Sequence, residues 1–239
     1  MEEVKIGSQT WSNKNLNVST FNNGDQITEC KTEKEWKKAA KNEMPAFCYY
    51  SCDIKNDAIY GKLYNWFAIN DHRGLAPDGW AIPSEKDWEA LTTFLGKKPG
   101  IKLKAIEGWK PNEEGKLDPG TDDFQFNALP SGYCEENGKF EGIGILAVWW
   151  SKTEALKSMA YYRPISSFNG VLVGSIPKGM CSKKEGNSVR LIKSIWFVYQ
   201  VSNKSDKEES NQLNEIKKEL EDLKLKQKEI LDALKNKQL

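Results

Sequence analysis

The 239-residue sequence contains a single histidine, His72, almost no net charge and no long apolar run. One histidine leaves no His-rich metal site and argues against Ser-His-Asp and Cys-His catalysis. A formal net charge of +1 gives no support for a nucleic-acid partner. No segment approaches the roughly 18 consecutive apolar residues that a spanning helix needs, so we expect no membrane insertion.

The C-terminal part of the chain also lacks whole classes of residue. Nine Trp, nine Phe and eight Tyr all lie before residue 200, and residues 203–239 contain no aromatic residue, proline or glycine. This change of composition predicts two domains, at residues 1–202 and 203–239, with residues 203–210 as a polar joint. The aromatic content of the first domain argues against disorder.

Apolar residues in the C-terminal segment recur at alternating steps of three and four, which predicts a coiled-coil oligomerisation helix. The seam consists of Leu213, Ile216, Leu220, Leu223, Gln227, Ile230 and Leu234. Leucine at a with isoleucine at d favours three or more strands, and Gln227 would fix the register. We therefore expect a homo-oligomer, with a trimer favoured. The alternative is that this stripe packs on the chain's own N-terminal domain.

The N-terminal domain has the pattern of an α+β fold with short strands, two helices and long loops. Thr32 and Glu35 form a capping-box pattern that predicts a helix over residues 33–41, and Ser84 and Gly96 bound a second, amphipathic helix. Strands are expected at residues 4–6, 46–50, 142–150, 161–167, 170–173 and 188–196. Long loops are expected at residues 97–122 and 175–186.

Several distinctive strings follow one another through this domain. They are IGSQTW (6–11) with NLNV (15–18), PAFCYY (45–50), YGKLYNW (60–66), PDGWAIP (77–83), FNALP (126–130) with GY (132–133), WWSKTE (149–154) and SVR (188–190). Together they resemble the Fibrobacter succinogenes major paralogous (FISUMP) domain over about residues 4–194. The resemblance implies a C-type-lectin-like head of short twisted strands and two helices, with a loop-rich face for ligands.

The cysteine content departs from this family. The resemblance implies cysteines at positions 76 and 191 that form one disulfide, whereas this chain has Ala76 and Leu191. The five cysteines present, an odd number without zinc spacing, are expected to be mostly free thiols, with one bridged pair as the alternative; they are Cys30, Cys48, Cys52, Cys134 and Cys181.

The N-terminus, MEEVKI, has no basic and apolar signal peptide. Together with the missing disulfide pair, this favours a protein made in the cytoplasm and associated with a virion. An extracellular surface is the expectation if Met1 is not the natural start.

Candidate catalytic and metal-binding groups are few. Adjacent carboxylates at 122–123 and 135–136 are expected to be solvated surface pairs. Asp53, Asn56 and Asp57 could ligate calcium, but an Asn/Asp turn is the commoner explanation. The related formylglycine-generating enzymes need paired cysteines late in the domain, where only Cys181 occurs. We therefore expect no catalytic residues, no metal and no cofactor.

Ligand contact is the chemistry that remains. Most tryptophans of the family strings are expected in the core, whereas Tyr161, Tyr162, Arg163, Phe168 and Asn169 lie in the region where the resemblance places ligand contacts. Tyrosine and arginine are enriched at binding hot spots. The leading hypothesis is a non-enzymatic recognition or attachment protein for a surface glycan or protein, of the kind found as a phage fibre or virion decoration. The alternatives are an assembly subunit whose C-terminal helix docks on partner helices and, third, a formylglycine-generating-type enzyme.

Overall fold

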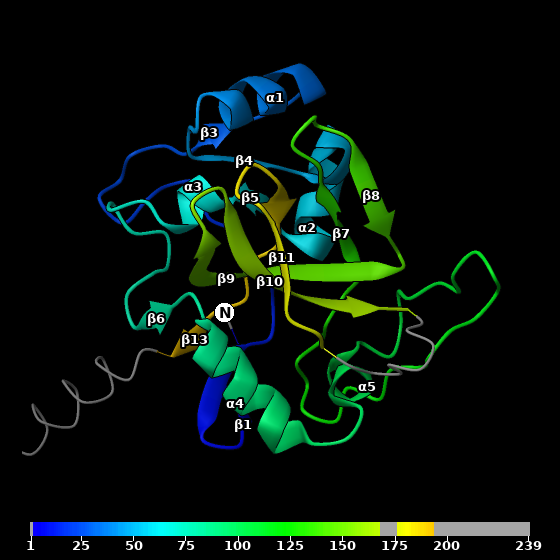
Figure 1. The fold of residues 1–239 in the computed structure, drawn as a ribbon. Coiled ribbons are helices and arrows are strands. Elements are labelled where there is room, and N and C mark those ends of the chain that lie inside the picture. Colours follow the sequence, from blue (N-terminus) through cyan, green and yellow to red (C-terminus); the bar gives the residue numbers. More distant parts are fainter. Residues whose placement is uncertain (1, 168–175, 194–239) are drawn as a thin grey trace, which may run out of the picture. The chain divides into compact units, whose positions relative to one another are not determined.

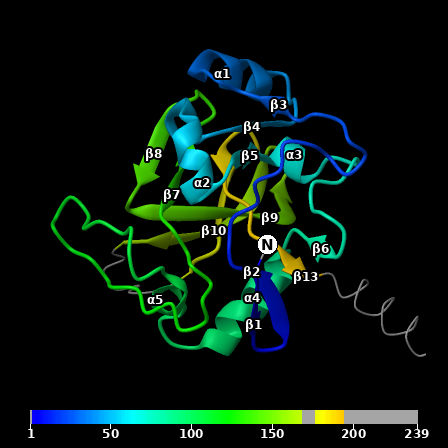
Figure 2. The ribbon, with the colours of Figure 1, turned by 180° about the vertical axis from the view of Figure 1, so that it is seen from behind.

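The computed structural model describes residues 2–167 and 176–193. They form a mixed α+β fold made mostly of strands, shown from two sides in Figures 1 and 2. The strands are β1 Glu3–Ile6, β2 Gln9–Ser12, β3 Thr28–Glu29, β4 Ala46–Cys48, β5 Leu63–Asn65, β6 Trp80–Ala81, β7 Ser131–Cys134, β8 Phe140–Ile143, β9 Leu146–Leu156, β10 Met159–Ser166, β11 Gly179–Ser182, β12 Gly186–Asn187 and β13 Ile192–Lys193. The helices are α1 Glu33–Lys41, α2 Asp57–Tyr60, α3 Trp66–Ile69, α4 Glu85–Leu95 and α5 Pro99–Leu103, with 3-10 turns at Tyr50–Cys52 and Ile54–Asn56.

The strands build two sheets. The larger has the order β11-β10-β9-β7-β12-β5-β4-β3, with β8 paired to β7, and the smaller has the order β1-β2-β13-β6. The long antiparallel pair β9 and β10 crosses the middle of the molecule in Figure 1. Its register places Trp150 opposite Tyr162 and Trp149 opposite Arg163, and this register decides which side chains reach the site described below.

Both predicted helices are confirmed, together with their capping residues. The Thr32 hydroxyl accepts a hydrogen bond from the Glu35 amide at 3.2 Å, and Trp36 on α1 is buried. At α4 the Asp87 carboxylate accepts from the Ser84 amide at 2.8 Å. Polar side chains therefore satisfy amides that the first turn leaves unpaired, as the sequence pattern predicts.

The expectation of only two helices is incomplete, because α2, α3 and α5 are additional helices of four or five residues. Segments this short carry too few periodic apolar positions to be recognised in a sequence. The predicted loop at 97–122 contains α5, and the predicted loop at 175–186 contains β11.

Three predicted strands are wrong in their extent. The strand expected at 46–50 ends at Cys48, and a 3-10 turn begins at Tyr50. The strand expected at 142–150 is divided by a turn in which the Ile145 amide donates to the Gly142 carbonyl at 3.0 Å. Of the strand expected at 188–196, only β13 forms among the described residues, and Ser188 makes an isolated bridge to Trp149. The strand expected at 170–173 and the coiled coil expected at 203–239 lie outside the described residues.

The aromatic residues of the family strings form much of the core. Trp11, Trp88 and Trp149 are fully buried and consecutive rings lie 4.8 and 6.1 Å apart, while Phe126 contacts both Trp11 and Trp149. Trp66 and Trp150 are buried in a second cluster. Trp80 is only half-buried.

The positions at which the resemblance implies a disulfide are apolar and packed. Leu191 is fully buried in one hydrophobic cluster, and Ala76 packs against the same cluster. All five cysteines are free thiols. Apolar packing therefore occupies the region where the resemblance implies a covalent link. In the described part of the chain, no helix has the length and apolar character needed to cross a membrane.

Lys104 is a buried charge that makes stability depend on pH. Its Nζ atom donates to the carbonyls of Asp118 and Ser167, both at 3.0 Å, and burial lowers the pKa of its side chain from 10.5 to about 8. Below pH 8 the amine is charged in both states, so the folded protein bears the desolvation cost. Between about pH 8 and 10.5 the unfolded chain keeps a proton that the folded protein has released, so this group favours folding more as pH rises.

We therefore expect the free energy of unfolding of Lys104→Met, minus that of the wild type, to decrease as pH rises through this interval. Each unit of pKa difference corresponds to about 1.4 kcal/mol. Urea unfolding of both proteins between about pH 7 and 11 measures this difference. The buried cysteines titrate in both proteins, so their contribution to the free energy of unfolding cancels in the difference. A difference that stays constant with pH would contradict the assignment to Lys104.

Candidate functional site

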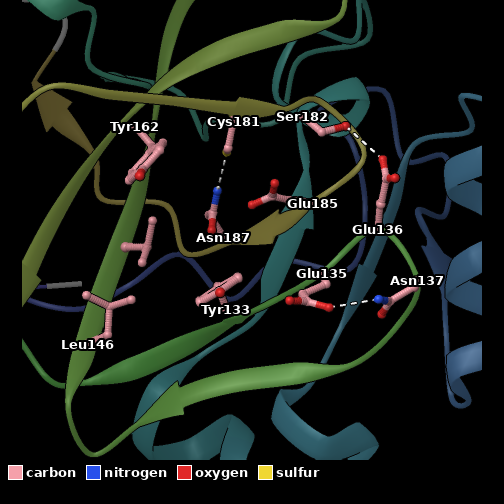
Figure 3. Close-up of a pocket in the computed structure, with 11 residues that line it drawn as sticks. Tyr133, Glu135, Glu136, Asn137, Leu146, Tyr162, Cys181, Ser182, Glu185 and Asn187 are labelled. Carbon is pink, nitrogen blue, oxygen red and sulfur yellow. Dashed lines mark hydrogen bonds between the residues drawn. The ribbon is translucent and has the colours of Figure 1, made fainter. Parts of the chain in front are cut away.

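A cavity of about 580 Å³ opens between β7, β9, β10 and β11, next to β12. This volume lies within the range of small-ligand sites. Figure 3 shows its lining, which consists of Tyr133, Glu135, Glu136, Asn137, Leu146, Val148, Tyr162, Cys181, Ser182, Glu185 and Asn187. The cavity lies entirely within the described residues.

One wall is apolar and aromatic because side chains alternate along a strand. Leu146 and Val148 on β9 point to the face that carries the cavity, and residues 147 and 149 point to the opposite face, where they join the tryptophan cluster. Tyr162, from β10, reaches the same cavity. Gly179 faces Tyr162 across β10 and β11, and a Cβ atom there would lie 2.5 Å from Cζ of the tyrosine. Glycine at this position therefore leaves room for the ring.

The rim is acidic. Residues 135–137 form the turn that follows β7, and a carboxylate oxygen of Glu135 accepts a hydrogen bond from Asn137 Nδ2 at 2.7 Å. A Glu136 oxygen accepts from the Ser182 hydroxyl at 3.2 Å, across to β11. Glu135 and Glu136 were predicted to be a solvated surface pair. In the structure both line the cavity, where Glu136 is exposed and Glu135 is half-buried.

Three polar groups lie deeper in the cavity. Asn187 is only 1% exposed, and its Nδ2 atom donates to the Cys181 sulfur at 3.6 Å. Its Oδ1 atom has no hydrogen-bond partner, and Figure 3 shows this oxygen on the side opposite Cys181. Burial raises the pKa of the Glu185 carboxyl, and the nearby charges of Glu136 and Glu135 raise it further, while a hydrogen bond with Cys181 opposes this. Burial likewise raises the pKa of the Cys181 thiol.

The structure separates the residues that the sequence predicts as ligand contacts. Tyr162 lines the cavity, whereas Tyr161 is half-buried on the other side of β10, with Lys178 Nζ 4.8 Å from its ring centre. Arg163 is 4% exposed and pairs with the buried Glu85 at 2.5 Å. Phe168 and Asn169 lie outside the described residues.

Most of the cavity's polar residues are not among the predicted ligand contacts. Tyr133 belongs to a family string but carries no separate signal of exposure. Glu185 lies in the loop predicted at residues 175–186, and Asn187 follows it directly. The signal that could have found them is the density of carboxylates and amides around 133–137 and 182–187, two segments that only the folded sheet brings together.

The remaining candidate groups have structural surroundings. Asp53 accepts a hydrogen bond from the Lys55 amide at 3.0 Å, and Asn56 donates to the Tyr50 carbonyl at 2.9 Å, which is the expected Asn/Asp turn. Asp57 lies 3.4 Å from Lys62 Nζ. Across residues 2–167 and 176–193, no three His, Cys, Asp or Glu side chains are grouped so that they could hold a metal ion.

Comparison with known proteins places this architecture in one family. Residues 4–193 match the family model described as the Fibrobacter succinogenes major domain (Fib_succ_major), and the match includes every residue that lines the cavity. No curated protein and no solved structure matches the chain.

Proposed function

We propose that this chain, which belongs to the Fibrobacter succinogenes major domain family, is a non-enzymatic recognition or attachment protein. In this proposal the head, on the C-type-lectin-like plan that the family strings imply, binds a surface glycan or protein ligand in the Tyr133–Tyr162 cavity. The C-terminal segment oligomerises the chain, and the assembled protein decorates a phage fibre or virion.

The observation that carries this proposal is the composition of the cavity. A tyrosine on each of two strands provides flat apolar surface, and a buried amide and partly exposed carboxylates provide hydrogen-bond acceptors. A largely apolar wall with a few fixed polar groups is the usual composition of a small-ligand site. The orphan Oδ1 atom of Asn187 adds a specific reason, because a buried polar atom without a partner costs free energy that a bound ligand can recover.

Oligomerisation would allow the protein to bind a surface stably even if each single site binds its ligand weakly. Linked sites bind a repetitive surface with an effective concentration set by their spacing, so avidity exceeds the affinity of one site. Light scattering coupled to size-exclusion chromatography tests this part on the intact chain. A trimer, or another closed oligomer, is the expected result. A monomer at all concentrations would favour docking of the segment on partner helices.

We expect Tyr162→Ala to weaken ligand binding by at least about tenfold, because removal of a buried aromatic contact costs about 2 kcal/mol or more at a binding hot spot. A glycan array and host-surface panel, probed with the intact protein and its variants, measures the effect. Tyr161→Ala is the matched control, because it removes the same side chain from the opposite side of β10 and should leave binding unchanged. Absence of any binding by the wild type, or equal loss in both variants, would count against the proposed site.

A further inference from the structure

The charges around the cavity all have one sign. Three glutamates line it, at positions 135, 136 and 185, and no Lys, Arg or His is among the lining residues. Within the described part of the chain, none of the three carboxylates takes part in an ion pair, although nine other Asp and Glu residues do. The negative charge of the cavity is therefore not neutralised by the protein itself.

The hydrogen-bonding groups of the cavity are unbalanced in the same direction. Apart from the hydroxyl groups of Tyr133 and Tyr162, which can donate or accept, the side-chain donors of the cavity are already engaged. Those of Asn137 and Ser182 are directed at the carboxylates of Glu135 and Glu136, and the amide nitrogen of Asn187 is directed at Cys181. The acceptors that remain include the Oδ1 atom of Asn187, which is buried and unpartnered. A ligand that satisfies this site must therefore bring hydrogen-bond donors.

The buried acceptor lies beside one of the three carboxylates, that of Glu185. Glu185 and Asn187 are two residues apart on the segment that enters and forms β12, and each interacts with the Cys181 side chain. Both line the inner part of the cavity, and Figure 3 shows them side by side. A cation beside Glu185 would also recover the cost of burying that carboxylate.

The geometry points to a sugar that carries a free ammonium group as the ligand, with the ammonium at Glu185 and Asn187 Oδ1 and the ring against Tyr133 and Tyr162. This inference rests on the proposed function, because it names the ligand class of the same cavity. An ammonium offers three donors and a positive charge, which match the free acceptors. It is also attracted to the faces of tyrosine rings.

The shape of the cavity distinguishes this ligand from other cations. A lysine side chain is narrow and has no flat face, so it would leave the tyrosine rings and much of the 580 Å³ volume uncovered. A hexose ring has an apolar face that stacks on an aromatic side chain. A divalent metal ion would need converging ligands, and Glu135 and Glu136 are instead turned to different partners, Asn137 and Ser182.

Calorimetric titration of the intact protein tests the inference with three probes that differ at one position. They are methyl glucosaminide, methyl glucoside and methyl N-acetylglucosaminide, which carry an ammonium, a hydroxyl and a neutral amide. We expect the glucosaminide to bind at least about tenfold more tightly than the other two, which is the effect of one charge-assisted contact. Nα-acetyl-lysine methylamide serves as a fourth probe, with the same ammonium on a chain.

Glu185→Gln should remove the preference for the glucosaminide, because it keeps the shape of the side chain and deletes its charge. Glu107→Gln deletes one charge from an exposed position outside the cavity, so it controls for the net charge of the protein. Circular dichroism confirms that each variant is folded. Glu135→Gln, at the more accessible rim, replaces Glu185→Gln if the latter does not fold.

Equal binding of glucosaminide and glucoside, tighter binding of the lysine derivative, or equal behaviour of the Glu185→Gln and Glu107→Gln variants would overturn the inference. So would the absence of saturable binding by every ammonium probe. None of these results removes the proposed recognition function, which is decided separately by the array and its dependence on Tyr162. Absence of binding by the wild type in both the array and the calorimetric titration would reject the proposed function and the inference together.

Discussion

We expect Arg163→Met to lower the free energy of unfolding by about 3–5 kcal/mol, because it leaves the Glu85 carboxylate buried without its cation. The Arg163 Nη2 atom lies 2.5 Å from Glu85 Oε2, and the two side chains are 5% and 8% exposed. The pair joins β10 to the first turn of α4. Breaking one half of such a pair costs far more than the pair itself contributes, since the remaining charge keeps its desolvation penalty.

Two variants make this expectation specific. Lys178→Met removes a neighbouring cation that lies 3.8 Å from Glu89 and is 45% exposed, so it should cost only about 0–1 kcal/mol. Glu85→Gln combined with Arg163→Met should be more stable than Arg163→Met alone, because the uncompensated charge has been removed. Urea denaturation of the four proteins gives the comparison. A loss in Arg163→Met no larger than in Lys178→Met would show that the ion pair is not what holds α4 to the sheet.

The same result bears on the sequence-based prediction that Arg163 contacts ligand. Tyr161, Tyr162 and Arg163 look equivalent in the sequence, because each is of a type enriched in binding sites. The register of β10 against β9 directs Tyr162 toward the cavity and places Arg163 in the buried interior. A strand's alternation can be predicted from sequence, but which of its two faces is solvated depends on the partner strands.

The features of the fold that could be predicted depend on local chemistry. Capping at Thr32 and Ser84 fixes where α1 and α4 begin, because the interactions span only three residues. The burial of Trp11, Trp88 and Trp149 follows from the large apolar area of each indole. These predictions need no knowledge of which segments are neighbours in space.

The candidate site could not be predicted in the same way because it is assembled from distant segments. Glu136 and Ser182 are 46 residues apart and meet only because β7, β10 and β11 belong to one sheet. Two adjacent glutamates alone are more often solvated surface. The unpartnered oxygen of Asn187 is a property of packing, and no feature of the sequence encodes it.

Gly132→Ala is expected to lower the free energy of unfolding by about 2–5 kcal/mol. This residue of β7 has φ +64°, and an added Cβ atom would lie 2.4 Å from the Glu141 carbonyl oxygen and 2.9 Å from the Ile143 amide nitrogen. Left-handed backbone costs a side-chain-bearing residue about 1–2 kcal/mol, and displacement of packed atoms adds about 1–3 kcal/mol. These two atoms belong to the backbone of β8, which cannot move without loss of its pairing to β7, and Cε2 of Tyr50 would also lie 2.6 Å from the added Cβ atom.

Gly115→Ala separates the two costs, because Gly115 also has a positive φ of +73° but no atom within 4 Å of the added Cβ. Its expected loss is the conformational cost alone, about 1–2 kcal/mol. Gly132→Ala should in addition weaken ligand binding, since Tyr133 is the next residue and lines the cavity. Thermal or urea unfolding gives the stabilities, and equal losses in the two variants would refute a contribution from contact with β8. Because the close approach of β8 determines the position of β7, the Gly132 backbone positions one tyrosine wall of the site.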